Sequence, residues 1–214
     1  FLTLTPIFAI AGTILHIIYE GLNLNLILIA LIFYFAAGLS ITAGYHRLFS
    51  HKSYNAHPIV RILFIIFGAA AFQNSVLKWC RDHRTHHKEC DRDDDPYCIK
   101  KGFWWAHIGW IFYKDEKVDF SNVKDLNADP WIRWQHRNIF LIGGFIGIII
   151  PTLIGFMMGS PIGGFAIIAM LRIVLTHHMT FFINSLCHII GKSTYSESNS
   201  SKDSFWMAFF TFGE

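Results

Sequence analysis

Long apolar runs limit what this chain can fold into. Residues 2–19 are almost uncharged, residues 22–45 and 139–158 contain no charged residue, and residues 162–190 contain one, Arg172. Each run is long enough to cross the hydrocarbon core of a bilayer, which takes roughly 20 residues of helix. Only 15% of the chain is charged, against about 25% in a typical soluble domain. The sequence therefore predicts an integral membrane protein.

The runs pair into two helical hairpins. Gly21 and Asn23 separate the first two runs, and a glycine-rich segment around Pro161 separates the last two. We predict four transmembrane helices, at about residues 4–19, 24–45, 139–158 and 162–187. The expected fold is all-α, with four spans in two hairpins, interfacial helices and a cytoplasmic cap, and residues 1–214 form a single domain.

The basic residues predict the orientation of these helices. Of the 18 Lys and Arg residues, 15 lie within residues 45–138, whereas the connections 20–23 and 159–164 contain none. By the positive-inside rule, residues 46–138 are cytoplasmic. Nucleic-acid binding is not expected, because these basic residues are interleaved with acidic ones beside membrane helices. The first run is not expected to be a secretory signal peptide, because it lacks a basic flank and a small-residue cleavage site.

A fifth apolar stretch, residues 58–77, is predicted not to span the membrane. If it did, the histidine motifs on its two sides would lie on opposite faces of the bilayer, too far apart to share metals. Arg61 near its start and Gln73 and Asn74 near its end also fit a helix that lies in the interface or dips in and out. Hydropathy alone leaves a true span as the alternative.

The cysteines are predicted to be unpaired thiols on the cytosolic side, because they show no C-x-x-C spacing. A disulfide or a zinc site is the less favoured alternative. The four residues are Cys80, Cys90, Cys98 and Cys187.

Histidines cluster in three motifs beside the apolar runs. The motifs are H-R-L-F-S-H (residues 46–51), H-R-T-H-H (residues 83–87) and N-S-L-C-H (residues 184–188). Histidines at positions i, i+3 and i+4, as in the second motif, project from one side of a helix. His46 and His51 are five residues apart, which is about 140° around an ideal α-helix. We therefore expect this pair to reach two different metals, or to lie where the helix ends.

The ligand type indicates the metal. Neutral imidazole binds iron, copper and zinc, whereas magnesium and calcium prefer oxygen. Zinc fits the ligands but cannot perform redox chemistry. Histidines at a membrane boundary thus predict a metal site, best suited to iron, that works on a substrate dissolved in lipid.

The third motif adds two residues to this site. His188 and Asn184 are one turn apart, so His188 can bind metal directly while the amide holds a metal-bound water.

Other polar groups are predicted to lie outside this site. His177 and His178 lie about 15 Å of helix away from His188 and, with Arg172, are expected to line a cavity. The remaining histidines lack partners at ligand spacing; they are His16, His57, His107 and His136.

Together these motifs resemble those of the integral-membrane fatty acyl desaturases, in particular the Δ9 (stearoyl-CoA desaturase-like) branch. The matching text is G-Y-H-R-L-F-S-H (44–51), F-Q-N-S-V-L-K-W-C-R-D-H-R-T-H-H-K (72–88), D-P (95–96), G-F-W-W-A-H-I-G-W (102–110) and N-S-L-C-H (184–188). H-x-x-H-H alone is also found in membrane hydroxylases, but the three motifs in this order are highly specific. The similarity runs from about Tyr34 to the last residue.

The resemblance implies an O₂-dependent oxidoreductase that places a cis double bond between C9 and C10 of a saturated acyl chain at a di-iron centre. O₂ is reduced to water with electrons from a separate donor protein of the cytochrome b5 or ferredoxin type. It implies seven positions at the two iron ions: His46, His51, His83, His86, His87 and His188 as direct ligands, and Asn184 through a water.

The resemblance also implies roles along the path of the substrate. Trp79, Gln73 and Thr180 resemble residues that shape the bend of the acyl tunnel. Asn74, Arg81 and Asp82 resemble contacts to the headgroup of the acyl carrier. Tyr34 and Gly38 fall where the family closes the far end of the tunnel, so we expect a larger residue at position 38 to shorten the preferred substrate.

The chain departs from the family at its end. The family's last motif, G-[YF]-H-N-[FY]-H-H, follows F-G-E, but the sequence stops at Glu214. We expect the 214-residue piece to lack ligands and to be inactive until the downstream residues are added.

Several alternatives remain open at this point. They are a di-iron membrane hydroxylase, a desaturase of other regiospecificity, a non-catalytic relative that senses lipid and, more remotely, a histidine-rich membrane metal transporter. The acyl group can be carried by coenzyme A, a carrier protein or a glycerolipid, and the sequence does not decide among these carriers, the chain length or the oligomeric state.

Overall fold

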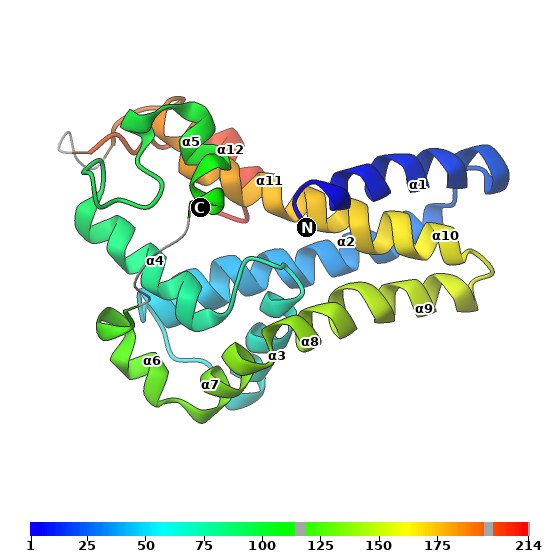
Figure 1. The fold of residues 1–214 in the computed structure, drawn as a ribbon, viewed down its shortest axis with the longest axis horizontal. Helices are drawn as coiled ribbons and strands as arrows, with labels where there is room; N and C mark the ends of the chain where they lie inside the picture. The colour runs from blue at the N-terminus through cyan, green and yellow to red at the C-terminus, as the bar shows by residue number, and fades with distance from the viewer. Residues whose placement is uncertain (114–118, 195–198, 214) are drawn as a thin grey trace.

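The computed structural model of the chain describes residues 1–113, 119–194 and 199–213. These residues form helices joined by loops, and the β interaction found among them is an isolated antiparallel bridge between Lys192 and Asp203. Long helices lie side by side along one part of the molecule, and shorter helices gather at the other end (Figure 1). The predicted all-α fold class is confirmed.

Within the described residues, three continuous helical stretches are long and apolar enough to cross a membrane: Leu24–Ser50, Ile139–Met157 and Pro161–His188. The first stretch consists of α2 (Leu24–Leu39) and the π-helix η1 (Ser40–Ser50). The second consists of α8 (Ile139–Gly144), the π-helix η5 (Phe145–Ile149) and α9 (Ile150–Met157). The third consists of α10 (Pro161–Gly163), the π-helix η6 (Gly164–Leu171), α11 (Arg172–Ser185) and the 3₁₀ turn η7 (Leu186–His188). The first stretch continues beyond the predicted end at residue 45, so His46 lies inside a helix.

The helix α1 (Leu4–Glu20) is apolar but shorter. Its 17 residues span about 26 Å at 1.5 Å per residue. It packs along η6, where an added methyl group on Gly12 would lie 2.7 Å from the Ala166 side chain. Small residues therefore let these two helices approach closely, as in membrane bundles.

The turns between the long helices follow the predicted breaks. Asn23 caps the start of α2, because its side-chain oxygen accepts a hydrogen bond from the Asn25 amide at 3.0 Å. Gly159 ends α9 with φ +75, a backbone conformation that favours glycine. Gly155 and Gly164 then pack so closely that a methyl group on Gly155 would lie 2.3 Å from the Gly164 Cα.

The outer faces of the long helices are apolar. Large aliphatic and aromatic side chains are exposed along them, including Ile18, Ile32, Phe140 and Met157. Such large exposed apolar surfaces are unusual on a soluble monomer and typical of contact with lipid. The arrangement fits an integral membrane protein.

Shorter elements make up the rest of the described chain. They are α3 (Pro58–Ala69), α4 (Val76–Glu89), η2 (Ile99–Lys101), α5 (Phe103–His107), η3 (Gly109–Phe112), η4 (Ser121–Val123), α6 (Lys124–Ala128), α7 (Pro130–Arg137) and α12 (Phe205–Phe210). All four cysteines lie in the described part of the chain, and no disulfide joins any two of them.

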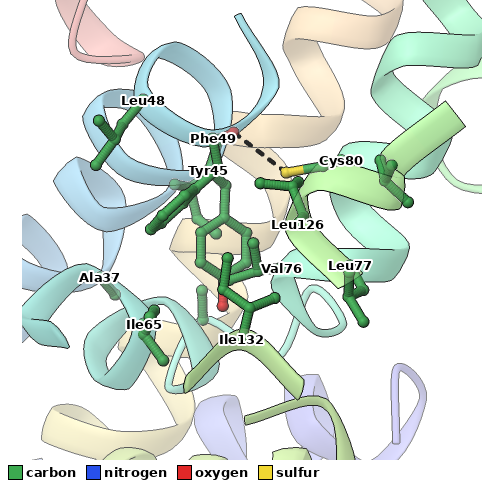
Figure 2. Close-up of a cluster of buried hydrophobic side chains, with 13 residues drawn as sticks. Ala37, Tyr45, Leu48, Phe49, Ile65, Val76, Leu77, Cys80, Leu126 and Ile132 are labelled. Atoms are coloured by element: carbon green, nitrogen blue, oxygen red, sulfur yellow. Dashed lines mark hydrogen bonds between the residues drawn. The ribbon is translucent and has the colours of Figure 1, made fainter. Parts of the chain in front are cut away.

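One buried core joins the histidine-bearing segments. The side chain of Gln135 on α7 donates to the Tyr45 hydroxyl at 2.6 Å and accepts from the Val76 amide at 3.1 Å. Figure 2 shows the hydrogen bond from the Cys80 thiol to the Tyr45 carbonyl oxygen. The sulfur lies 3.4 Å from this oxygen. Burial raises the pKa of the Cys80 thiol to about 12, so it stays protonated and can donate. The core therefore fixes η1 against the first turns of α4.

The end of α3 lies inside the molecule and is held by donors from α11. Arg172 is 1% exposed, and its guanidinium donates to the carbonyls of Ala70 at 2.6 Å and Gly147 at 2.7 Å. His177 Nε2 lies 2.8 Å from the carbonyl oxygen of Ala71. Buried helix ends need such partners, since polar groups shielded from solvent cannot bond to water instead. Arg172 thus ties α3 and η5 to α11, which gives this buried charge a structural role.

We predict that Arg172→Met destabilises the protein by about 2–5 kcal/mol, because each carbonyl left buried without a donor costs about 1–3 kcal/mol. Thermal unfolding in detergent measures the effect. Arg137→Met, at an exposed arginine of α7, is the control. Equal unfolding midpoints for the two variants would contradict this account of Arg172.

Candidate metal centre

The π-helix η1 aligns the first two histidines. Its hydrogen bonds run from residue i+5 to residue i, as in the bond from the His51 amide to the His46 carbonyl at 3.0 Å. Residues five apart are therefore stacked on one face, and the two Nε2 atoms lie 3.0 Å apart. The 140° separation calculated for an α-helix does not apply to this winding. The alternative expectation, that the pair lies where the helix ends, is confirmed, because η1 ends at Ser50.

The helix α4 brings two more histidines to the same point. His83 Nε2 lies 3.0 Å from His51 Nε2 and 3.0 Å from His87 Nε2. The ligand atoms of His46, His51, His83 and His87 all lie within 4.8 Å of one another. We call these four residues the four-histidine group.

The spacing within the four-histidine group fits a shared cation. Two imidazole nitrogens each about 2.1 Å from one metal are about 3.0 Å apart when they meet it at a right angle. Without a cation, the three contacts of 3.0 Å could not all be hydrogen bonds, since the proton on a ring nitrogen points to one acceptor. The donor set and its spacing therefore fit a transition metal.

The other two predicted histidines form a second pair. The rings of His86 and His188 have centroids 5.7 Å apart. His86 Nδ1 lies 2.8 Å from an oxygen of Asp95, and His188 Nδ1 lies 2.7 Å from the Ser200 hydroxyl. These bonds use Nδ1 and leave Nε2 of each ring for another partner. Cys90 has its sulfur within 4.8 Å of ligand atoms of both histidines.

The two groups are neighbours. The His86 ring centroid lies 5.7 Å from that of His87 and 6.4 Å from that of His83. The fold thus brings six histidines from three distant segments together. Asn184, the seventh predicted position, lines two cavities beside His83.

Two imidazoles on α4, those of His83 and His87, are held in the neutral form. Burial, with the neighbouring histidines His46 and His87, keeps the pKa of His83 well below its usual range. Burial and nearby His51 lower the pKa of His87 to about 4. Neutral imidazole is the form that binds metal, so both residues are ready to act as ligands at pH 7.

Three cavities lie in succession beside the histidines. The inner cavity, of about 60 Å³, and the middle cavity, of about 460 Å³, share Trp79, His83, Thr180 and Asn184. The outer cavity, of about 740 Å³, shares Asn74, Asp82, Trp110 and Ile111 with the middle one. The residues predicted to contact substrate all line these cavities: Tyr34 and Gly38 the inner one, Trp79 and Thr180 the inner and middle, Gln73 the middle, Asn74 and Asp82 the middle and outer, and Arg81 the outer.

The cavities differ in chemical character. The inner cavity is lined mainly by apolar side chains such as Ile41, Met179 and Ile183. The outer cavity carries the cations Lys78, Arg81 and Lys88 among its lining residues, together with several aspartates. The three cavities therefore match a long molecule whose apolar tail lies in the inner cavity and whose charged head lies in the outer one. The middle of such a molecule would pass His83.

Sequence reasoning missed the residues that line the inner cavity from the end of the described chain. The Phe212 ring lies 5.4 Å from the rings of both Tyr34 and Phe35. A methyl group on Gly38 would lie 2.2 Å from the Phe212 ring. No sequence pattern links positions so far apart in the chain.

His107, which sequence analysis left without partners, braces α5 against α11. Its Nδ1 lies 3.0 Å from the Ser185 hydroxyl and its Nε2 lies 3.1 Å from His178 Nδ1. Ser185 directly follows Asn184, so this contact helps to fix the point where α11 ends beside the cavities.

Apolar membrane-length helices with a histidine cluster beside an apolar cavity define the class of histidine-box membrane proteins. The chain belongs to the fatty acid desaturase family, whose sequence model matches residues 23–214. This confirms the resemblance seen in the motifs.

Three relatives illustrate the similarity. A probable acyl-CoA desaturase of Schizosaccharomyces pombe is 41% identical over 212 residues, which are 98% of this chain and 43% of that protein. Acyl-CoA desaturase 1 of Saccharomyces cerevisiae is 37% identical over 210 residues, 97% of this chain and 40% of that protein. The sn-1 stearoyl-lipid 9-desaturase of Synechocystis is 35% identical over 186 residues, 86% of this chain and 57% of that protein. The chain thus spans about half the length, or less, of these relatives.

We predict that His83→Ala lowers the metal content of the full-length protein by about one equivalent, because His83 Nε2 lies between two other ligand nitrogens of the four-histidine group. Elemental analysis of the purified protein measures this. The control is His57→Ala, which removes an exposed histidine at the start of α3. Unchanged metal content in His83→Ala would contradict the assignment.

Proposed function

We propose that this chain carries the catalytic part of an O₂-dependent fatty acyl desaturase that introduces a cis double bond, at C9, into a saturated acyl chain. One observation carries the proposal: the apolar cavities pass directly beside His83 of the four-histidine group. Family membership and the named activities of the relatives support it.

Two iron ions are the proposed cofactor. The four-histidine group would hold one, and His86 with His188 would contribute to the other, with Asn184 acting through a water. When bound, the two irons supply the oxidising power: O₂, two external electrons and two protons are converted with two substrate hydrogens into two waters. Breaking an unactivated C–H bond needs such a cofactor, while the protein supplies position and excludes water.

The chain's own residues would position the substrate. The Trp79 ring stacks on the His83 ring with centroids 4.8 Å apart, which gives an apolar wall beside the reacting carbons. Gln73 donates to the Thr180 hydroxyl at 2.9 Å and so joins the loop after α3 to α11 at the junction of two cavities. A misplacement of the substrate by about 1 Å can lower the rate about a hundredfold. A hydrogen bond that fixes this part of the cavity wall therefore matters for the rate.

The proposed carrier is a phosphorylated one, coenzyme A. The outer cavity offers Lys78, Arg81 and Lys88, which suit phosphate groups. The two yeast relatives are named as acting on acyl-CoA, whereas the cyanobacterial one is named for stearoyl-lipid. A glycerolipid is therefore the alternative carrier. The electron donor would be a separate protein of the cytochrome b5 or ferredoxin type.

The proposed membrane arrangement has four spans, α1 included, with residues 46–138 on the cytoplasmic face. The helix α3 has 12 residues, or about 18 Å, against a hydrocarbon core of about 30 Å. We propose that it enters the membrane and returns on the same side. Arg172 and His177, which hold its inner end, support this arrangement.

Expression of the full-length protein in a yeast strain lacking its Δ9-desaturase tests the function. The expected result is the appearance of Δ9 mono-unsaturated acyl chains in the lipid profile, with none for His83→Ala. A hydroxylated product, or a double bond at another carbon, would contradict the proposal and favour a hydroxylase or another regiospecificity. Metal uptake without any lipid product would favour a transporter. The absence of both a lipid product and metal uptake would favour a lipid sensor.

We predict that Gly38→Phe shifts the products of the full-length protein toward shorter acyl chains, because the inner cavity, which Gly38 and Phe212 both line, has to accommodate a second ring where a single added methyl group already meets Phe212. Gas chromatography of the products measures the shift. Gly144→Phe is the matched control, since a side chain there meets open space. Identical chain-length distributions in both variants would refute a role of position 38 in chain length.

A further inference from the structure

A hydrogen-bonded chain behind His188 joins two loops that lie far apart in the sequence. Asp91 follows α4, and Ser200 follows η7. The Ser200 hydroxyl lies 2.7 Å from one oxygen of Asp91, and the Ser200 amide lies 2.6 Å from the other. The same hydroxyl lies 2.7 Å from His188 Nδ1. Asp91 is 9% exposed, so solvent competes little for these bonds.

The directions of these hydrogen bonds can be derived. An ionised carboxylate only accepts, and Asp91 receives two bonds from one serine. The Ser200 hydroxyl therefore donates its proton to Asp91. Its oxygen is left to accept, so His188 must carry its proton on Nδ1. The lone pair of His188 then lies on Nε2, the nitrogen left for a metal.

His86, the other member of the second pair, is held in a similar way. Its Nδ1 lies 2.8 Å from Asp95, a carboxylate that also accepts from the amides of Asp91 at 3.0 Å and Tyr97 at 3.1 Å. One loop thus orients both histidines, His86 directly and His188 through Ser200. Asp91 is part of both arrangements, because its amide bonds to Asp95 and its carboxylate to Ser200.

We propose that Ser200 and Asp91 are positioning residues for the second metal: they fix the proton of His188 on Nδ1 and aim its Nε2 at that metal. This inference rests on the proposed function and extends it to two residues outside the histidine motifs. Partners that hold the outer nitrogen of a ligating histidine typically contribute 10- to 100-fold to metal affinity.

The test is titration of the metal-free, full-length protein with Co²⁺, followed by its visible absorption bands. Wild type should bind two equivalents. Ser200→Ala should weaken one of the two equivalents 10- to 100-fold and leave the other unchanged. Ser200→Thr, which keeps the hydroxyl, should restore the affinity. Ser201→Ala, which removes the neighbouring hydroxyl that bonds to Asn199, is the matched control.

Three outcomes would overturn the proposal that Ser200 and Asp91 position His188. Equal weakening of both equivalents would indicate a general structural effect. Failure of Ser200→Thr to restore binding would exclude the hydroxyl as the acting group. A much larger loss in Asp91→Ala than in Ser200→Ala would make Asp91 itself a ligand. Each differs from failure of the proposed function, in which wild type itself would bind no pair of metals or form no unsaturated product.

Discussion

The packing of η1 on α4 around Tyr45 is the constraint on which the metal centre depends. The ring, hydroxyl and carbonyl of Tyr45 are all engaged, by Trp79, Gln135 and Cys80. His46 is the next residue after Tyr45, and His83 lies one turn beyond Trp79 on α4. Because this core is closely packed and hydrogen-bonded, it sets the separation of the two helices, and with it the 3.0 Å spacings between ring nitrogens. The supporting core therefore positions the site.

A second constraint comes from the buried end of α3. The chain lets α3 end inside the molecule, where Arg172 and His177 take the place of water as hydrogen-bond donors. This break leads directly into Phe72, Gln73 and Asn74, which line the middle cavity. The burial of an arginine, which costs free energy, thus allows irregular backbone to form part of a cavity wall.

The sequence predicted the helical class, the long apolar helices and the family, because these follow from composition, periodicity and local motifs. It also named the six histidines and the eight cavity residues that the fold brings together. It did not reveal where the geometry departs from the standard helix: an α-helix would separate His46 and His51 by about 140°, whereas a π-helix stacks them. It gave no indication of Phe212, Ser200 or the partners of His107, since those contacts join residues far apart in the chain and only the tertiary fold defines them.

The π-winding of Ser40–Ser50 also couples the winding of the helix to the number of residues in the first motif. An α-helix of the same length would turn His51 about 140° away from His46. A chain lacking one residue between them would place the two histidines four apart, which in an α-helix is only about 40° around the axis. A π-helix with a five-residue spacing and an α-helix with a four-residue spacing therefore both present two imidazoles on one face. The number of residues between the histidines is informative only together with the winding of the helix, which a hydropathy plot does not report.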